Sequence, residues 1–126
     1  MSYISPMGWD VEYTDELGVW WDSLDEGEQD SVAAYVRLLE EPRAGAALSL
    51  QFGGGDFPTY THMRELRVQH QGRPYRVLYA FDPRRTAMLL IGGNKTGNDR
   101  WYEEYVPGAD QLYDEHLQQL REEGLL

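Results

Sequence analysis

The chain has 126 residues, 41% of them hydrophobic and 13% aromatic, which is typical of a globular protein with one core, so we treat residues 1–126 as a single domain. It has no cysteine, which excludes disulfides and thiolate metal sites, and no apolar run approaches the roughly 18 residues of a membrane span, so we expect a cytoplasmic protein without a membrane partner. The formal net charge of −11 argues against a nucleic-acid ligand unless the basic residues are clustered.

The first predicted elements are a strand and two helices. Residues 9–13 alternate between apolar and polar side chains, as in a half-buried strand. Thr14 is a typical N-cap residue, and apolar residues at helical spacing then predict a short helix. Asp25 and Glu28 have the spacing of a capping box, so a second helix begins there. Pro42 predicts its end, because the residue before a proline is disfavoured in a helix.

A loop, a group of strands and a last helix follow. Residues 42–61 predict a long loop with three consecutive glycines, which we expect to be partly mobile or functional. Three strands joined by short turns are then predicted at 63–70, 73–81 and 86–91. Residues 94–99 predict a polar loop, and the last helix is predicted at 107–122, with Pro107 in its first turn.

This order predicts an α+β fold, with an N-terminal strand and a helical hairpin packed on an antiparallel β-meander, followed by a C-terminal helix. The first strand is expected to join the sheet as a fourth strand. We expect the helices to pack on one face of the sheet.

The basic residues are unevenly distributed along the chain. Residues 60–102 contain eight of the 11 Lys and Arg residues but only three of the 22 acidic residues. This segment therefore carries +5, and the remainder of the chain carries −16. Such asymmetry indicates one face reserved for an anion, with the acidic remainder facing water or a partner.

Several segments in this order resemble the RelE/HigB toxins of type II toxin–antitoxin modules. The segments are the tryptophan pair at 20–21, the strands at 64–67 and 75–79, and the loop and helix start at 94–102. The resemblance extends over about residues 8–120. Three features depart from the family pattern: the overall acidity, Glu65 at a position where some relatives have lysine, and a helix after Pro107 that is longer than in the smallest members.

The resemblance implies a RelE-like fold and a toxin that cuts messenger RNA without a metal, usually at the ribosome. It also implies a cognate antitoxin, expected to be a helix-turn-helix protein encoded nearby, and a toxin–antitoxin heterotetramer. No cofactor is expected, and the three scattered histidines give no metal-ligand set.

Metal-independent RNA cleavage needs cationic groups and proton donors or acceptors around the phosphate. The candidate catalytic residues are Arg67, Arg76, Lys95, Tyr102 and His62. The two arginines lie on neighbouring predicted strands, and a hairpin can bring them to one face. The lysine and tyrosine take their roles from the resemblance, while the histidine is preferred over His70 as an acid or base because it adjoins the basic strand.

The other basic residues of the 60–102 segment are predicted to bind RNA: Arg64, Arg73, Arg84, Arg85 and Arg100. Two other functions stay open at this point. One is a ParE-like toxin that poisons DNA gyrase and has no nuclease chemistry. The other is a non-catalytic binding module or decayed toxin, which the acidic surface and Glu65 would favour.

Overall fold

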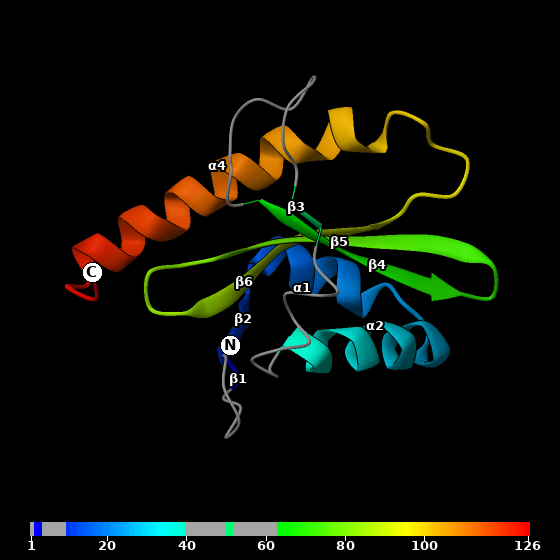
Figure 1. Ribbon diagram of the computed structural model, residues 1–126, viewed down its shortest axis with the longest axis horizontal. Helices are drawn as coiled ribbons and strands as arrows, with labels where there is room; N and C mark the ends of the chain where they lie inside the picture. Colours follow the sequence, from blue (N-terminus) through cyan, green and yellow to red (C-terminus); the bar gives the residue numbers. More distant parts are fainter. Residues whose placement is uncertain (1, 4–9, 40–49, 52–62) are drawn as a thin grey trace.

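The computed structural model describes residues 2–3, 10–39, 50–51 and 63–126, which form an α+β fold around a six-stranded sheet (Figure 1). The strand order across the sheet is β1-β2-β6-β5-β4-β3. The strands are β1 (Ser2–Tyr3), β2 (Asp10–Tyr13), β3 (Leu50–Gln51), β4 (Arg64–His70), β5 (Arg73–Phe81) and β6 (Thr86–Asn94). The helices are α1 (Asp15–Asp22), α2 (Glu26–Leu39) and α4 (Trp101–Glu122). The predicted fold class is confirmed.

The centre of the sheet is the predicted meander, in which β5 pairs antiparallel with both β4 and β6. Gln71 and Gly72 form the turn between β4 and β5 with φ values of 51° and 75°, and positive φ at both positions is what a type I′ hairpin requires. The predicted first strand joins the sheet as β2, but it runs parallel to β6, so the sheet is mixed rather than antiparallel throughout. β6 continues past its predicted end at residue 91, into the predicted polar loop.

The predicted loop at 42–61 contains one described element, the two-residue strand β3, which pairs antiparallel with β4. The segment is therefore not a loop throughout, as the sequence predicted. Residues 42–49 and 52–61 lie outside the described residues, so the mobility expected of them stays a prediction. The predicted end of the second helix before Pro42 lies outside them as well.

Both helix starts of the hairpin follow the sequence prediction. The Thr14 side chain accepts a hydrogen bond of 3.0 Å from the Leu17 amide, so it caps α1. Asp25 and Glu28 form the capping box reciprocally. The Glu28 amide donates to Asp25 Oδ1 at 2.8 Å, and the Asp25 amide donates to Glu28 Oε1 at 2.9 Å. Local side-chain chemistry therefore fixes where α1 and α2 begin.

The C-terminal helix differs from the prediction. We expected it to begin at Pro107, but α4 is continuous from Trp101 and has this proline inside it. A proline at that position removes one backbone hydrogen bond. Trp101 and Val106 before the proline and Ala109 after it are all buried against the sheet, so packing on both sides holds the two segments in one helix.

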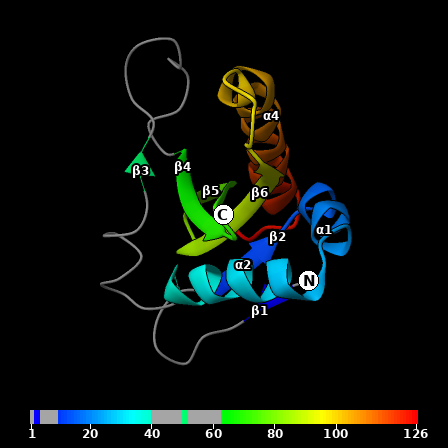
Figure 2. The same ribbon diagram turned by 90° about the vertical axis from the view of Figure 1, so that its right-hand side faces the viewer.

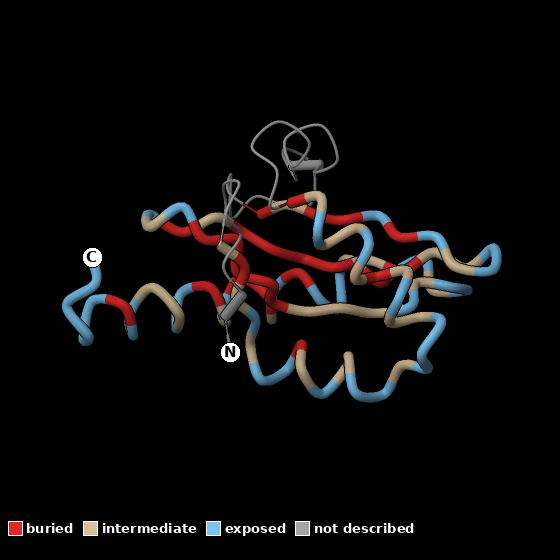
Figure 3. The backbone as a smooth tube through the Cα atoms, turned by 90° about the horizontal axis from the view of Figure 1, so that it is seen from below, coloured by how far each residue is buried: buried red, intermediate tan, exposed pale blue. Residues whose placement is uncertain are grey.

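The helices cover both faces of the sheet, and not one face as the sequence predicted (Figure 2). Helices α1 and α2 pack on one face, and together with the strands they form a buried cluster: Val11, Leu17, Val32, Leu39, Leu66, Val68, Tyr75, Val77, Tyr79, Ala87 and Leu89. Helix α4 covers the cluster Met63, Leu78, Ala80, Met88, Leu90, Trp101, Val106, Ala109 and Tyr113. The reason lies in β5, where the successive residues Val77, Leu78, Tyr79 and Ala80 are all buried although their side chains alternate between faces, so each face needs a cover. Figure 3 shows that buried residues run through the middle of the molecule between the layers of helices.

Two adjacent glycines near the end of β6 each receive a tryptophan ring, one from each layer of helices. A Cβ atom on Gly92 would lie 2.2 Å from the ring of Trp20 in α1. A Cβ atom on Gly93 would lie 2.6 Å from the indole nitrogen of Trp101 in α4. Both distances are shorter than any normal contact, so only glycine fits at these positions. The two glycines allow the start of α4 and the last turn of α1 to approach the sheet closely.

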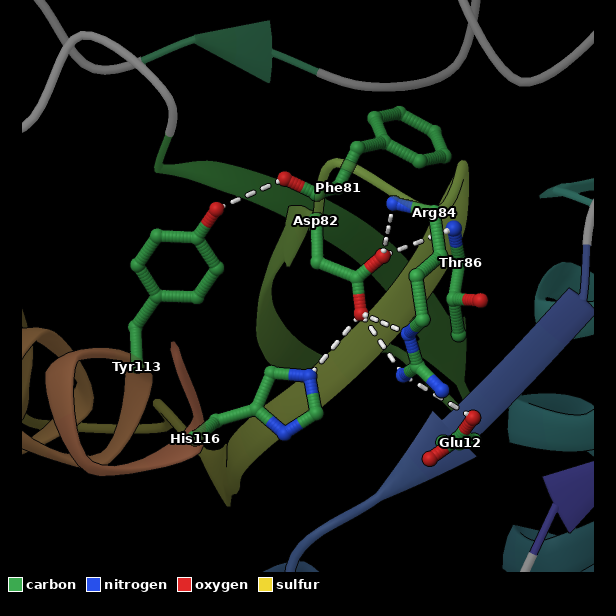
Figure 4. Close-up of polar contacts among 7 residues, drawn as sticks. All are labelled: Glu12, Phe81, Asp82, Arg84, Thr86, Tyr113 and His116. Carbon is green, nitrogen blue, oxygen red and sulfur yellow. Dashed lines mark hydrogen bonds and ion pairs between the residues drawn. The ribbon is translucent and has the colours of Figure 1, made fainter. Parts of the chain in front are cut away.

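The turn between β5 and β6 lies at the end of the sheet opposite the 95–100 loop (Figure 1), and Asp82 in this turn joins three elements (Figure 4). Its Oδ2 atom lies 2.9 Å from His116 Nε2 on α4 and 2.7 Å from Arg84 Nη2. Its Oδ1 atom accepts hydrogen bonds from the Arg84 amide at 2.9 Å and the Thr86 amide at 3.2 Å. Arg84 Nη2 is also 3.1 Å from Glu12 Oε2 on β2. This network ties β2, the turn and α4 together.

A second contact reinforces the attachment of α4, because the Tyr113 hydroxyl donates a hydrogen bond of 2.8 Å to the carbonyl of Phe81 (Figure 4). Burial by itself would raise the pKa of Asp82, whose side chain is 0% exposed. Hydrogen bonds from His116 and Arg84 outweigh burial and lower the pKa of Asp82 from 3.8 to about 2. The folded state therefore favours the ionised carboxylate.

We expect Asp82→Asn to lower the free energy of unfolding at pH 7 by about 2 kcal/mol, which is the order of magnitude of the pKa difference. Because the folded-state pKa is depressed, the wild-type advantage is present above pH 3.8 and is lost as the pH falls toward about 2. Urea unfolding between pH 7 and pH 2 measures this. The exposed Asp99→Asn is the matched control and should change little. An Asp82→Asn variant as stable as the wild type at pH 7 would contradict the assignment.

Candidate active site

The register of the β4–β5 hairpin pairs Arg67 directly with Arg76. Leu66 and Val68, on either side of Arg67, are buried under α1 and α2. Since strand side chains alternate between faces, Arg67 points to the face covered by α4. Arg76 in turn pairs with Gly93 of β6, next to the start of α4. The structure thus brings the two predicted arginines together.

Glu65 lies on the same face, two residues before Arg67, and its side chain is only 2% exposed. Its Oε1 atom accepts a hydrogen bond of 2.7 Å from Arg67 Nε, and its Oε2 atom lies 4.0 Å from Arg76 Nε. This hydrogen bond raises the pKa of Arg67 above its usual value. A buried carboxylate is costly unless it is paired; here Arg67 is hydrogen-bonded to it, and Arg76 and Tyr102 lie beside it.

Tyr102, in the first turn of α4, completes the cluster. Arg76 Nε donates a hydrogen bond of 3.0 Å to its hydroxyl oxygen, and Lys95 Nζ lies 5.6 Å from the centroid of its ring. Burial, and then the neighbouring Glu65, raise the pKa of the Tyr102 hydroxyl, whereas Arg76 acts in the opposite direction. The net direction is upward, so this hydroxyl is protonated at neutral pH and can donate a proton or a hydrogen bond.

The two arginines differ in how accessible they are. The Arg67 side chain is 55% exposed, while that of Arg76 is 12% exposed and also donates from Nη1 to the Tyr75 carbonyl at 3.0 Å. A ligand can therefore reach Arg67 directly, whereas Arg76 is mostly buried and holds the Tyr102 hydroxyl through its hydrogen bond. Two guanidinium groups lie beside one carboxylate, and Lys95 lies beside the ring of Tyr102, so the cluster has more positive than negative groups and suits an anion.

The five arginines predicted to bind RNA do not gather around this cluster. The guanidinium carbon of Arg64 lies 5.9 Å from the ring centroid of Phe81, which packs on the side of α1 and α2. That of Arg73 lies 5.8 Å from the ring centroid of Tyr75, in the same buried layer. Both arginines are therefore on the opposite face of the sheet from Tyr102.

Arg84 and Arg85 lie in the β5–β6 turn, at the other end of the sheet from the cluster (Figure 1). Arg100 is nearer, since it directly precedes α4, and its side chain is 76% exposed. Its Nε atom donates to Glu103 Oε2 at 2.9 Å, which offsets its charge. The basic segment identified in the sequence is thus divided between both faces and both ends of the sheet.

The histidines do not add to the cluster among the described residues. His62 lies outside the described residues, so its predicted role stays a prediction. His70, the other histidine considered, has its Nδ1 atom 2.7 Å from the Ser31 hydroxyl on α2. Its ring packs edge-on against Tyr75 at 6.2 Å. His70 therefore attaches α2 to the β4–β5 hairpin.

The residue whose place in the site sequence reasoning missed is Glu65, which was named only as a departure from the family pattern. The structure places its carboxylate at the centre of the cluster, in contact with Arg67. A usable signal was present in the sequence: Glu65 and Arg67 are two apart on a strand, so they share a face.

A cavity of about 360 Å³ lies on the other face of the sheet, between the helical hairpin and the strands. Apolar side chains such as Leu17, Trp20 and Val36 line it, and none of the predicted catalytic residues does. The cluster of predicted catalytic residues is therefore separate from this cavity.

The described residues contain no group of three or more side chains that could hold a metal ion, and no helix among them is long and apolar enough to cross a membrane.

Comparison with known proteins identifies a family and two relatives of this chain. Residues 19–114 match the family model described as phage-derived protein Gp49-like. The chain belongs to the Gp49-like family. The resemblance to HigB-type toxins is confirmed by two further relatives, both from Mycobacterium tuberculosis (strain ATCC 25618 / H37Rv).

The first of these relatives is designated toxin HigB2 and is 36% identical over 120 residues, which is 92% of this chain. This Gp49-like chain spans 58% of the length of that relative. The second is designated toxin HigB3 and is 39% identical over 95 residues, which is 73% of this chain and 79% of the relative. No solved structure matches the chain significantly.

Proposed function

We propose that this Gp49-like chain is the toxin of a type II toxin–antitoxin system and a metal-independent endoribonuclease that cuts messenger RNA at the ribosome, in the cytoplasm. The observation that carries the proposal is the convergence of Arg67, Arg76, Lys95 and Tyr102 on one face of the sheet. These are four of the five candidate catalytic residues, and they come from two strands, a loop and a helix.

The reaction would use the 2′-hydroxyl of the RNA as the nucleophile against the adjacent phosphorus. The 2′-hydroxyl gives up its proton as its oxygen bonds to phosphorus, the bond from phosphorus to the 5′-oxygen breaks, and the leaving 5′-oxygen takes up a proton. The products are a 2′,3′-cyclic phosphate and a 5′-hydroxyl. Negative charge builds up on the phosphoryl oxygens in the transition state, and fixed cationic donors stabilise it. Arg67 is suited to this role because its guanidinium is both exposed and anchored.

Tyr102 would donate or relay a proton, because its hydroxyl is held by Arg76 and remains protonated at neutral pH. Lys95, beside the ring of Tyr102, would contact the phosphate or the leaving oxygen. Arg76 would add charge beneath both and fix the tyrosine in place. His62 is left out of this assignment because it lies outside the described residues.

The partner proposed for this chain is a cognate antitoxin, a helix-turn-helix protein encoded nearby, that silences the toxin in a heterotetramer. Both relatives carry toxin names, which supports such a partner. The acidic remainder of the chain, with a net charge of −16, would suit a partner with a basic surface.

A cleavage assay tests the proposed chemistry. We expect the purified protein to cut a messenger RNA, free or during translation, in the presence of EDTA and to leave 2′,3′-cyclic phosphate ends. A substrate with a 2′-deoxy nucleotide at the cleaved position should resist, because it lacks the nucleophile. Cleavage of that substrate, or cleavage that stops when the metal is chelated, would contradict the proposal.

Expression in bacteria tests the toxin assignment. We expect the chain alone to arrest growth with loss of full-length messages, and co-expression of its antitoxin to restore growth. Arrest with intact messages and damaged DNA would favour a gyrase poison instead. Normal growth despite verified expression of folded protein would favour a non-catalytic module.

A further inference from the structure

Glu65 presents a problem for a site that binds RNA. Its carboxylate is 2% exposed and lies next to the cationic groups proposed to bind phosphate. By charge alone it should weaken the binding of an anion. The geometry suggests the opposite effect, through what the carboxylate does to its two arginine neighbours.

The first neighbour is Arg67. Its Nε–H donates to Glu65 Oε1 at 2.7 Å, while the side chain as a whole is 55% exposed. A guanidinium is planar and presents its donors in a fixed fork. Once Nε is bound to a buried acceptor, the plane of the group is set, and with it the directions of the two terminal nitrogens; the Tyr102 side chain also contacts this guanidinium. An unanchored arginine at this position would sample many rotamers and lose more entropy on binding.

The second neighbour is Arg76. It lies directly opposite Arg67 across the two strands, and like charges in such a pair repel. Glu65 Oε2 lies 4.0 Å from Arg76 Nε, so the carboxylate contacts one guanidinium and lies close to the other. Arg76 Nε is also the donor that holds the Tyr102 hydroxyl at 3.0 Å. Glu65 therefore offsets the repulsion that would otherwise separate the members of the cluster.

We propose that Glu65 is a positioning residue that orients the terminal nitrogens of Arg67 toward a phosphate of the RNA and keeps Arg67 and Arg76 together beneath it. Glu65 acts through the arginines and does not itself touch the substrate. This inference rests on the proposed function, because it takes RNA as the ligand.

The charge-neutral variant Glu65→Gln separates positioning from simple electrostatics, because the two predict opposite changes in the affinity for RNA. A 2′-O-methyl oligoribonucleotide is the probe, since it binds without being cut, and fluorescence anisotropy measures its affinity. Positioning predicts that Glu65→Gln binds about tenfold more weakly and cuts RNA about 10 to 100 times more slowly, as expected for misplaced catalytic groups. Tighter binding, as charge alone predicts, would overturn the proposal.

Glu104→Gln is the matched control, because it removes the same charge from an exposed position in the first turn of α4. We expect its affinity to be unchanged or slightly higher. Equal losses in the two variants would overturn the proposal. So would slower cleavage by Glu65→Gln at unchanged affinity, which would instead make Glu65 a proton acceptor.

A double-variant cycle tests whether Glu65 acts through Arg67. In an Arg67→Ala background, Glu65→Gln should change affinity and cleavage by less than about twofold, because the group that it orients is gone. If Glu65→Gln lowers affinity and cleavage by the same factor with and without Arg67, the two residues act independently and the proposal is overturned. If wild-type protein binds the probe but never cuts RNA, the proposed nuclease function fails, while the affinities still decide the role of Glu65.

Arg67→Lys provides a second test that does not alter a buried residue. Lysine keeps the charge but lacks the Nε–H that Glu65 holds and the planar fork. If Glu65→Gln does not fold, this variant decides: a loss of affinity of about tenfold supports oriented recognition, and unchanged affinity overturns it.

Discussion

Arg76→Ala is expected to reduce RNA cleavage by about 10² to 10³-fold, the effect of removing one donor that stabilises transition-state charge. Two losses combine in this variant. The positive charge beneath the phosphate disappears, and Tyr102 loses the 3.0 Å hydrogen bond that fixes its hydroxyl. Single-turnover cleavage measures the chemical step, and circular dichroism with urea unfolding shows whether the variant is folded.

Arg121→Ala is the matched control, because it removes an exposed arginine at the other end of α4. It should cut RNA at the wild-type rate. Arg76→Lys should recover only part of the activity, since lysine supplies the charge but cannot contact the hydroxyl and the Tyr75 carbonyl with a planar group. A folded Arg76→Ala variant that cuts as fast as the wild type would show that the active site has been placed wrongly.

Gly93→Ala is expected to lower cleavage by about tenfold or more in protein that remains folded. Its Cβ atom would lie 2.6 Å from Trp101 Nε1 and about 3 Å from two ring carbons. The indole must therefore move, and Tyr102 is the next residue in α4. Overpacking of this kind also destabilises a protein, typically by about 1–3 kcal/mol.

Gly92→Ala is the control for this prediction. Its Cβ atom would lie 2.2 Å from Trp20, a closer approach than at Gly93, but on the face of α1. We expect an equal or larger loss of stability, with the cleavage rate of the folded fraction unchanged. If both variants lose activity in proportion to stability, the position of Trp101 has no specific influence on Tyr102.

Local chemistry explains which parts of the fold were predictable. The N-cap at Thr14 and the capping box of Asp25 and Glu28 depend on groups three residues apart, so the sequence contains both partners. The β4–β5 hairpin is similar. A two-residue turn at 71–72 fixes which residues face one another, and it places Arg67 opposite Arg76.

Other features depended on distant partners, and these were predicted incorrectly or missed. The continuity of α4 through Pro107 depends on packing against the sheet, which outweighs one lost hydrogen bond. The contact of Asp82 with His116 joins residues 34 apart. A pattern of residue types does not show such pairs, because many acids and bases along the chain could have met.

The sequence by itself determined the α+β class, the starts of α1 and α2, the meander and the family resemblance, since each depends on local periodicity, on capping or on residue order. Only the tertiary structure decided which face each helix covers and which basic residues belong together. Basic residues that are close in the sequence need not be close in space. Successive side chains of a strand point to opposite faces of the sheet, and the two ends of an extended strand are far apart. For the same reason Arg64 and Arg67, three residues apart, lie on opposite faces of the sheet, while Tyr102 lies beside Arg76.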